Sequence, residues 1–228
     1  APTVASTFAS SAAVAAGLAQ VAEMNGEDQR VICFAGDGGT YDIGMAALSG
    51  AAERNDDILY ICYDNEIYGN TGGQRSSATP FGATTTTTPG GKKLQKKDIT
   101  AIMAAHRIPY VASVSLAHLA DTRRKMEQAL DMRGFRFLHV FAPCPTGWKS
   151  EQSEGIDLIR LAVDSGLFPV MEIFDGLETK INIEPSMSDA ALEKYFSSQG
   201  RFKKNKVNIT EIRAAINANW KRLRHSTA

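Results

Sequence analysis

Two short apolar runs, each followed at once by a polar turn, constrain this fold more than any other feature. Residues 31–35 read Val-Ile-Cys-Phe-Ala and lead into Gly-Asp-Gly-Gly at 36–39, and residues 58–62 read Ile-Leu-Tyr-Ile-Cys and lead into Tyr-Asp-Asn at 63–65. Such near-continuous apolar strands are typical of a parallel sheet that is buried on both faces. Ligands bind outside the carboxyl ends of such strands, so we expect the two turns to lie side by side at a binding edge.

Further apolar runs alternate with helical patterns, which predicts an α/β fold of three layers, α/β/α, with a mainly parallel sheet. Asp42 and Asp98 are expected to cap helices, and Ser115 is expected to begin one. The predicted strands are 31–35, 58–62, 110–114, 137–141, 169–173 and 180–183. The predicted helices are 3–22, 43–53, 98–105, 115–132, 153–165, 190–198 and 209–223. We divide the chain into a main domain, 1–175, and a C-terminal extension, 176–228, that packs on it or on a partner and carries no chemistry of its own.

The composition argues against several classes of function. Twenty-five basic residues balance twenty-five acidic ones, so no net charge directs the chain to nucleic acid. No run approaches the ~20 apolar residues of a membrane span. Three cysteines, two of them inside apolar runs, predict no disulfide framework and a reducing cytoplasm. The lysine-rich segment 92–97 is either a solvated loop or a patch that attracts a phosphorylated cofactor or an acidic partner such as a ferredoxin.

Asp37 and Asn65 bring oxygen ligands to the predicted binding edge. Mg²⁺ takes hard oxygen ligands in octahedral geometry and often shares them with phosphates. The Asp37 carboxylate, the Asn65 amide oxygen and a backbone carbonyl near Ile67 would supply three of them. The glycines at 36–39 and the helix start after Asp42 would offer backbone N–H groups to phosphate. Each turn alone is also compatible with an ordinary Gly- and Asp-containing turn, but together they predict a site for a divalent metal on a diphosphate.

The spacing of these residues resembles a known cofactor motif. Gly-Asp-Gly at 36–38, followed after the 26 residues 39–64 by Asn65, is similar to the motif of thiamine diphosphate enzymes. The longer segments GDGGTYDIGMAALSGAAERNDD, YDNEIYGNTGGQRSSATPFGA and HVFAPCPTGW resemble the β subunit of pyruvate:ferredoxin oxidoreductase and its 2-oxoacid relatives. The resemblance runs from the first helix to about Gly176, and more loosely beyond. It implies the thiamine diphosphate-binding fold.

The resemblance also implies roles for individual residues. Mg²⁺ would be bound by Asp37, Asn65 and the Ile67 carbonyl. The full set of cofactor-binding residues would be Gly36, Asp37, Gly38, Gly39, Asn65, Ile67, Asn70 and Thr71. Asn70 would in addition reach the substrate, which makes it the candidate catalytic residue. The alternative is that Asn70 is a turn residue among neighbouring glycines.

Cys144 stands between two prolines in the loop after the predicted strand 137–141. Its position resembles that of the isolated, late cysteine ligand of the family's [4Fe–4S] cluster, whose other ligands lie near the N-terminus. Such clusters generally take four thiolates, and this chain has no Cys-x-x-Cys. We therefore expect either that a leading segment with the other ligands is missing, which the start at Ala1 favours, or that the cluster is absent.

The resemblance implies a subunit of a 2-oxoacid:ferredoxin oxidoreductase, which most simply converts pyruvate and CoA to acetyl-CoA and CO₂ and passes electrons through the cluster to ferredoxin. A partner subunit would carry the aminopyrimidine-binding domain, so the chain is expected to be inactive alone. One alternative is the same scaffold acting on another small acid, such as oxalate, without CoA. Others are a non-oxidative thiamine diphosphate decarboxylase or synthase, and a non-catalytic assembly subunit. A nicotinamide-binding domain is disfavoured because Gly-x-Gly-x-x-Gly is missing.

Overall fold

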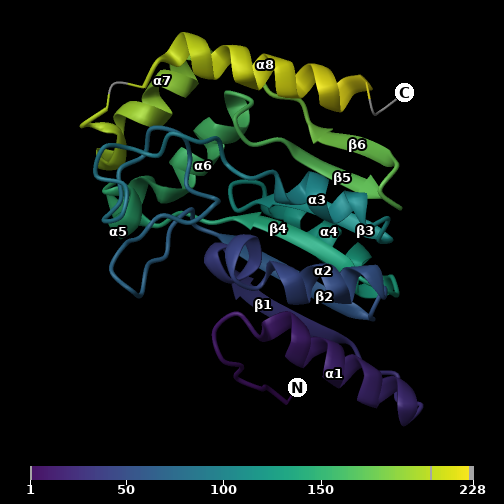
Figure 1. The fold of residues 1–228 in the computed structure, drawn as a ribbon. Helices are drawn as coiled ribbons and strands as arrows, with labels where there is room; N and C mark the ends of the chain where they lie inside the picture. The colour runs from purple at the N-terminus through teal and green to yellow at the C-terminus, as the bar shows by residue number, and fades with distance from the viewer. Residues whose placement is uncertain (1, 206, 226–228) are drawn as a thin grey trace.

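A six-stranded sheet forms the centre of the computed structural model, which describes residues 2–205 and 207–225 (Figure 1). The strands are β1 (Val31–Gly36), β2 (Ile58–Asp64), β3 (Tyr110–Ser115), β4 (Arg136–Phe141), β5 (Val170–Phe174) and β6 (Glu178–Ile183), in the spatial order β1-β2-β4-β3-β5-β6. The first four strands are parallel, whereas β5 pairs antiparallel with both β3 and β6. The predicted α/β class with a mainly parallel sheet is confirmed.

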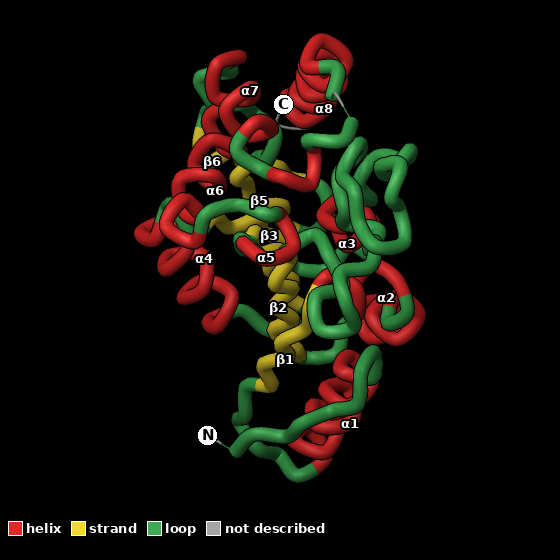
Figure 2. The backbone as a smooth tube through the Cα atoms, turned by 90° about the vertical axis from the view of Figure 1, so that its left-hand side faces the viewer, coloured by secondary structure: helices red, strands yellow, loops and turns green. Residues whose placement is uncertain are grey.

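Helices cover both faces of this sheet, with α1, α2 and α3 on one side and α4 and α6 on the other (Figure 2). This arrangement confirms the predicted three layers. The α-helices are α1 (Ser11–Met24), α2 (Met45–Glu53), α3 (Ile99–Ala105), α4 (Leu119–Asp131), α5 (Pro145–Trp148), α6 (Gly155–Asp164), α7 (Asp189–Ser197) and α8 (Ile209–His225). A π-helical turn, η1 (Gly38–Asp42), and two 3₁₀ turns, η2 (Gln152–Glu154) and η3 (Gly200–Phe202), complete the list. Among the described residues, no helix has the length and apolar character needed to cross a membrane.

The central apolar runs are buried on both faces, whereas in β1 Ile32 and Phe34 are exposed. All six residues of β3 are buried, and in β2 Tyr63 alone is exposed. The Tyr60 ring stacks against Phe135 and Phe137, with centroids 6.3 and 5.8 Å away. Helix α1 packs against β1 and α2. Its buried residues are all small, which lets the helix approach the sheet closely: Ala12, Ala15, Ala16, Ala19 and Ala22.

Three helix starts differ from the prediction. The first helix begins at Ser11 instead of residue 3. Asp42 does not cap α2, because it is the last residue of the π-helical turn and Gly44 occupies the cap position. Ser115 ends β3, and α4 begins four residues later, after His118. Asp98 is confirmed as a cap, since its carboxylate accepts a hydrogen bond from the Ala101 N–H at 3.0 Å.

The C-terminal third continues the same structure. Strand β6 lengthens the sheet beyond β5, and α7 packs against α6. The predicted amphipathic face of the last helix is confirmed, because Ile216 and Trp220 are buried while Ile209 and Ile212 pack beside them. The Trp220 indole N–H also donates to the Gly166 carbonyl at 2.8 Å. These contacts bring residues 189–205 close to the loops that follow β2 and β4.

Candidate functional site

The two turns singled out in the sequence lie next to each other. Strands β1 and β2 are neighbours in parallel register, and Gly36 at the end of β1 pairs with Tyr63 near the end of β2. Asp37 follows directly on β1, and Asn65 follows directly on β2. The prediction that both turns meet at the carboxyl edge of the sheet is therefore confirmed.

Asp37, Asn65 and Ile67 converge on one point. The Asn65 amide group lies 3.0 Å from the Asp37 Oδ1 and 2.9 Å from the Ile67 carbonyl oxygen. If the amide nitrogen faces these two atoms, it donates to both. If the amide oxygen faces them, three oxygens meet, as they do around a cation. Ligands at the 2.0–2.1 Å distance of Mg²⁺ in octahedral geometry lie about 2.9 Å apart, so the three groups fit this metal.

The electrostatic state of Asp37 also fits a cation. Its side chain is only 2% exposed. This burial, together with the nearby Asp64 carboxylate, raises the pKa of Asp37 to about 7, although the Ser76 hydroxyl donates a hydrogen bond to the carboxylate. A cation bound beside Asp37 would offset the burial and the repulsion, and would keep the carboxylate ionised.

The glycine turn has no room for side chains. A Cβ at Gly38 would lie 2.3 Å from the Tyr68 ring, and the Tyr68 hydroxyl donates to the Gly38 carbonyl at 3.1 Å. A Cβ at Gly44 would lie 2.0 Å from the Gly39 carbonyl oxygen. The chain folds here into a single π-helical turn, a conformation that occurs frequently at functional sites.

Hydrogen bonds anchor the long loop after β2 to this π-helical turn. The Asp42 carboxylate accepts hydrogen bonds from the Ser77 N–H at 3.0 Å and from the Tyr68 hydroxyl at 3.0 Å, so it joins the two segments instead of capping a helix. Lys92 is buried and donates to the Ser77 and Thr79 carbonyls at 2.9 and 2.5 Å.

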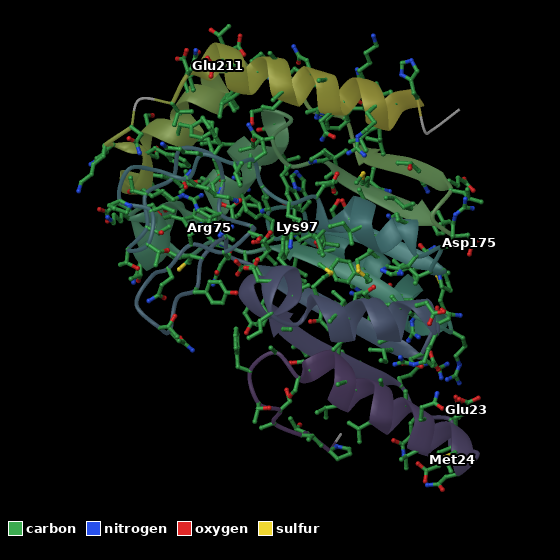
Figure 3. All side chains as sticks on the ribbon, viewed as in Figure 1. Glu23, Met24, Arg75, Lys97, Asp175 and Glu211 are labelled. Atoms are coloured by element: carbon green, nitrogen blue, oxygen red, sulfur yellow. The ribbon has the colours of Figure 1, made fainter. Side chains whose placement is uncertain are left out.

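Two other lysines of the segment 92–97, Lys96 and Lys97, also have partners inside the protein. Lys97 lies at the centre of the molecule, above α2, where its ammonium donates to the Tyr41 carbonyl (Figure 3). Lys96 forms ion pairs with Asp64, the last residue of β2, and with Glu66 in the loop that follows. Only Lys93 of the four is exposed. The interpretation of this segment as a solvated loop is therefore wrong for three of its four lysines.

Asp64 is the first of two carboxylates that flank Asn65. It is fully buried, and its Oδ2 lies 2.6 Å from the Lys96 ammonium, 2.8 Å from the Tyr41 hydroxyl and 2.7 Å from the His139 Nε2. Burial alone would raise the pKa of Asp64, but Lys96 and His139 outweigh it and hold the pKa well below its usual range. Asp64 is thus a charged anchor at the end of β2.

Glu66 is the second flanking carboxylate. Its two oxygens bind different cations, Lys96 at 3.0 Å and Arg201 at 2.6 Å. The Arg201 side chain is 2% exposed and comes from η3, 135 positions further along the chain. Sequence reasoning missed this ion pair because nothing near Glu66 in the chain indicates its partner.

Asn70 and Thr71 lie apart from the three converging groups. Residues 68–74 form a small turn that is closed by backbone hydrogen bonds between Tyr68 and Gln74. Asn70 and Thr71 are exposed at its tip, where the Thr71 hydroxyl donates a hydrogen bond to the Gln74 side chain at 2.5 Å. Within the part of the chain that the structure describes, no hydrogen bond connects Asn70 with the Asp37 group.

Cys144 is held against the same edge. It precedes α5, and its sulfur accepts a hydrogen bond from the Gly147 N–H at 3.3 Å. A Cβ at Gly147 would lie 2.8 Å from the Ile67 side chain, so α5 packs directly on the loop that carries Asn65. The Trp148 indole N–H donates to the Asn65 carbonyl at 2.8 Å.

The other cysteines do not accompany Cys144. Cys33 and Cys62 are buried in β1 and β2, as predicted, and burial raises the pKa of the Cys33 thiol to about 12. Over residues 2–205 and 207–225, no three His, Cys, Asp or Glu side chains are grouped to hold a metal ion. The oxygen set formed by Asp37, Asn65 and Ile67 is of a different kind, because two of its members are an amide and a backbone carbonyl.

Comparisons with known proteins agree with this site. Residues 1–140 match the family described as thiamine pyrophosphate enzyme, C-terminal TPP binding domain. The chain is similar to the ketoisovalerate oxidoreductase subunit VorB of Pyrococcus abyssi, with 46% identity over 89% of this chain and 67% of that protein. It is also similar to the pyruvate synthase subunit PorB of Pyrococcus furiosus, with 40% identity over 97% of this chain and 74% of that protein.

A solved structure shares the fold. The 2-oxoglutarate:ferredoxin oxidoreductase from Magnetococcus marinus, with 2-oxoglutarate, coenzyme A and succinyl-CoA bound, superposes with a TM-score of 0.59. The match has 22% identity and covers 91% of this chain and 73% of that one. The motif, the fold and the relatives lead to one conclusion. The chain belongs to the family of thiamine pyrophosphate-binding β subunits of 2-oxoacid:ferredoxin oxidoreductases.

Proposed function

We propose that this subunit binds Mg²⁺ and the diphosphate of thiamine diphosphate at the edge formed by residues 36–39 and 63–71. The observation that carries the proposal is the position of the Asn65 amide, 3.0 Å from the Asp37 Oδ1 and 2.9 Å from the Ile67 carbonyl oxygen. When bound, thiamine diphosphate supplies the electron sink for loss of CO₂ from a 2-oxoacid. The residues of this chain orient the cofactor and exclude water around its charged end.

The residues around the metal would divide this task. Asp37 would contribute the charged ligand, and Asn65 and the Ile67 carbonyl would contribute neutral oxygens. Gly36, Gly38 and Gly39 would present their backbone to the diphosphate. At the exposed tip, Thr71 would contact the cofactor and Asn70 would contact both cofactor and substrate. The aminopyrimidine would be activated by a carboxylate of a partner subunit, so the isolated chain would be inactive.

The overall reaction would be oxidative decarboxylation of a 2-oxoacid, with CoA accepting the acyl group. Relatives are named for pyruvate and for ketoisovalerate, and the structural neighbour binds CoA. Pyruvate is our first candidate for the substrate. The two electrons released per acid would leave one at a time, through a [4Fe–4S] cluster with Cys144 as one ligand, to two ferredoxin molecules.

An anaerobic absorbance measurement on the assembled complex tests this reaction. Mixing the complex with pyruvate, CoA and Mg²⁺-thiamine diphosphate should bleach the visible iron–sulfur absorbance and release CO₂. Omitting CoA should suppress acyl transfer. A colourless complex that releases CO₂ would favour a non-oxidative decarboxylase, and turnover of oxalate at an equal rate without CoA would favour the other alternative substrate class.

The assignment of Cys144 has its own test. Cys144→Ala should lower the iron content of the complex by one cluster's worth and abolish ferredoxin reduction, while the affinity for thiamine diphosphate stays unchanged. Cys33→Ala is the matched control, because Cys33 is buried within β1 and should not affect the iron content. Unchanged iron in the Cys144→Ala variant would contradict its role as a ligand.

A further inference from the structure

Arg201 joins the C-terminal third of the chain to the loop of the proposed metal ligands. Its guanidinium is almost fully buried, and it donates to the Glu66 carboxylate at 2.6 Å and to the Gln199 side chain at 2.8 Å. An arginine is rarely buried without a specific set of partners. Here the carboxylate that it meets belongs to the residue between Asn65 and Ile67.

The backbone of Glu66 explains why that contact matters. Glu66 has a φ of 66°, in the left-handed region that residues other than glycine rarely adopt. Asn65 and Ile67 lie on either side of this residue, so its backbone conformation influences how the Asn65 side chain and the Ile67 carbonyl are oriented relative to each other. Two side chains fix it through the carboxylate, Arg201 and Lys96, and the Thr79 hydroxyl fixes it through the Glu66 carbonyl at 2.7 Å.

Arg201 also reaches the loop from a second side. Its guanidinium lies over the Trp148 ring, 4.5 Å from the ring centroid. Trp148 in turn donates its indole N–H to the Asn65 carbonyl at 2.8 Å. One side chain therefore supports Asn65 through Trp148 and holds Glu66 directly. The C-terminal extension, which was expected to pack on the main domain, thus contacts the loop of the proposed metal ligands through Arg201.

We propose that Arg201 is a positioning residue, which sets the geometry of the Mg²⁺ ligands by holding Glu66 in its left-handed conformation. This inference rests on the proposed function, because it concerns the same metal site. Partners of metal ligands orient those ligands, and their removal typically lowers metal affinity about 10- to 100-fold. The affinity for Mg²⁺ is therefore the property that Arg201 should control.

Arg213 provides a matched control within the same extension. It is also mostly buried, and it donates to the Asp189 carboxylate at 2.6 Å and to the Ser165 and Ser188 carbonyls at 2.7 and 3.1 Å. None of these partners belongs to the loops after β1, β2 or β4. Arg213→Met should thus reduce stability in the way that loss of a buried arginine does, with no effect on the metal site.

The experiment measures the Mg²⁺ dependence of thiamine diphosphate binding by calorimetry, together with the thermal midpoint, in the complex assembled from the full-length subunits. Arg201→Met should raise the Mg²⁺ concentration needed for half-maximal binding about 10- to 100-fold. A large excess of Mg²⁺ should restore kcat. Arg213→Met should lower the thermal midpoint by a similar amount and leave the Mg²⁺ requirement unchanged.

The possible outcomes are separable. An Arg201→Met complex with the Mg²⁺ requirement of the wild type, destabilised like Arg213→Met, would overturn the inference and leave the proposed function intact. A wild-type complex that binds no thiamine diphosphate with Mg²⁺ would overturn the proposed function itself. If Arg201→Met does not assemble, Glu66→Gln decides, because it keeps the shape of the side chain and removes the charge that Arg201 binds. An unchanged Mg²⁺ requirement in Glu66→Gln would also overturn the inference.

Discussion

Two halves of one loop differ sharply in how they are held. Asn65, Glu66 and Ile67 are surrounded by partners, with ion pairs to Lys96 and Arg201 on one side and the Asp37 carboxylate on the other. A few residues later, residues 69–71 are exposed, and their hydrogen bonds to other described residues stay within the turn 68–74. The first half has the rigidity that a metal site needs, and the second leaves its side chains free for a substrate or a partner subunit.

The difference suits two separate functions in the proposed site, metal binding and substrate contact. Metal ligands work best when their geometry exists before the ligand arrives, because no ordering is then needed on binding. A substrate contact at an exposed tip can instead be completed by groups from a partner subunit. We therefore expect substitutions in the held half to affect folding or metal binding, and substitutions at the tip to affect cofactor contact and turnover without affecting folding.

The largest expected effect separates two glycines. Gly44→Ala should destabilise the subunit by about 3 kcal/mol or more, because the new Cβ would lie 2.0 Å from the Gly39 carbonyl oxygen and the backbone must move. Gly69→Ala should change the free energy of unfolding by less than about 0.5 kcal/mol, since nothing lies within 4 Å of its Cβ position. Urea unfolding of the purified subunit measures both. Equal effects would mean that the exposed tip is packed as closely as the backbone around Gly44.

Substitution of Asn70 should affect activity and leave stability unchanged. Asn70→Ala is expected to lower kcat/KM for the 2-oxoacid about 10- to 100-fold, the effect of losing one hydrogen bond to a charged substrate. Its thermal midpoint should equal that of the wild type, and its affinity for thiamine diphosphate should fall less than kcat/KM does, because the other cofactor-binding residues remain. Asn25→Ala, at the end of α1, is the exposed control. An Asn70→Ala complex with normal kcat/KM would leave the tip without a role.

The last expected effect concerns pH and the anchored part of the loop. Burial lowers the pKa of Lys92 to about 8, whereas an unfolded lysine titrates near 10.4. Because the unfolded chain binds more protons between these values, Lys92 should make the free energy of unfolding rise from about pH 8 to 10.4.

The neighbouring Lys93 provides a control for the contribution of Lys92 to the pH dependence of the free energy of unfolding. The rise should be flatter in Lys92→Met and unchanged in Lys93→Met, since Lys93 is exposed. Urea midpoints recorded across this pH interval for the three proteins test the point. Parallel curves for all three would mean that Lys92 keeps an ordinary pKa, and that the loop is less enclosed than the structure indicates.

Much of the proposed metal site could be predicted because its signals are local. An apolar run predicts a buried strand, and the residue after the run lies at the carboxyl edge. Asp37 and Asn65 could be predicted in this way, and the Asn65 amide lies 3.0 Å from the Asp37 Oδ1. The antiparallel placement of β5 carries no such signal, because the sequence of a buried strand is similar in either direction.

The contacts that hold the site could not be predicted, for a physical reason. Glu66 and Arg201 are 135 positions apart, and an ion pair of this kind leaves no periodicity in the chain. Asp42 was expected to cap a helix because Asp commonly does so, but the π-helical turn uses its carboxylate to bind Ser77 and Tyr68. The tertiary contact outweighed the local preference.

The central claim is that Asp37, Asn65 and the Ile67 carbonyl hold Mg²⁺ on thiamine diphosphate. Its most direct test is the Mg²⁺-dependent binding of thiamine diphosphate to complexes that carry Asp37→Asn or Asp57→Asn. Asp57 is the control, because it pairs with Arg133 and Arg136 just before β2 begins, at the opposite end of that strand. The account predicts that Asp37→Asn weakens this binding about 100-fold or more and that Asp57→Asn leaves it unchanged. Wild-type binding by the Asp37→Asn complex at the same Mg²⁺ concentration would contradict it.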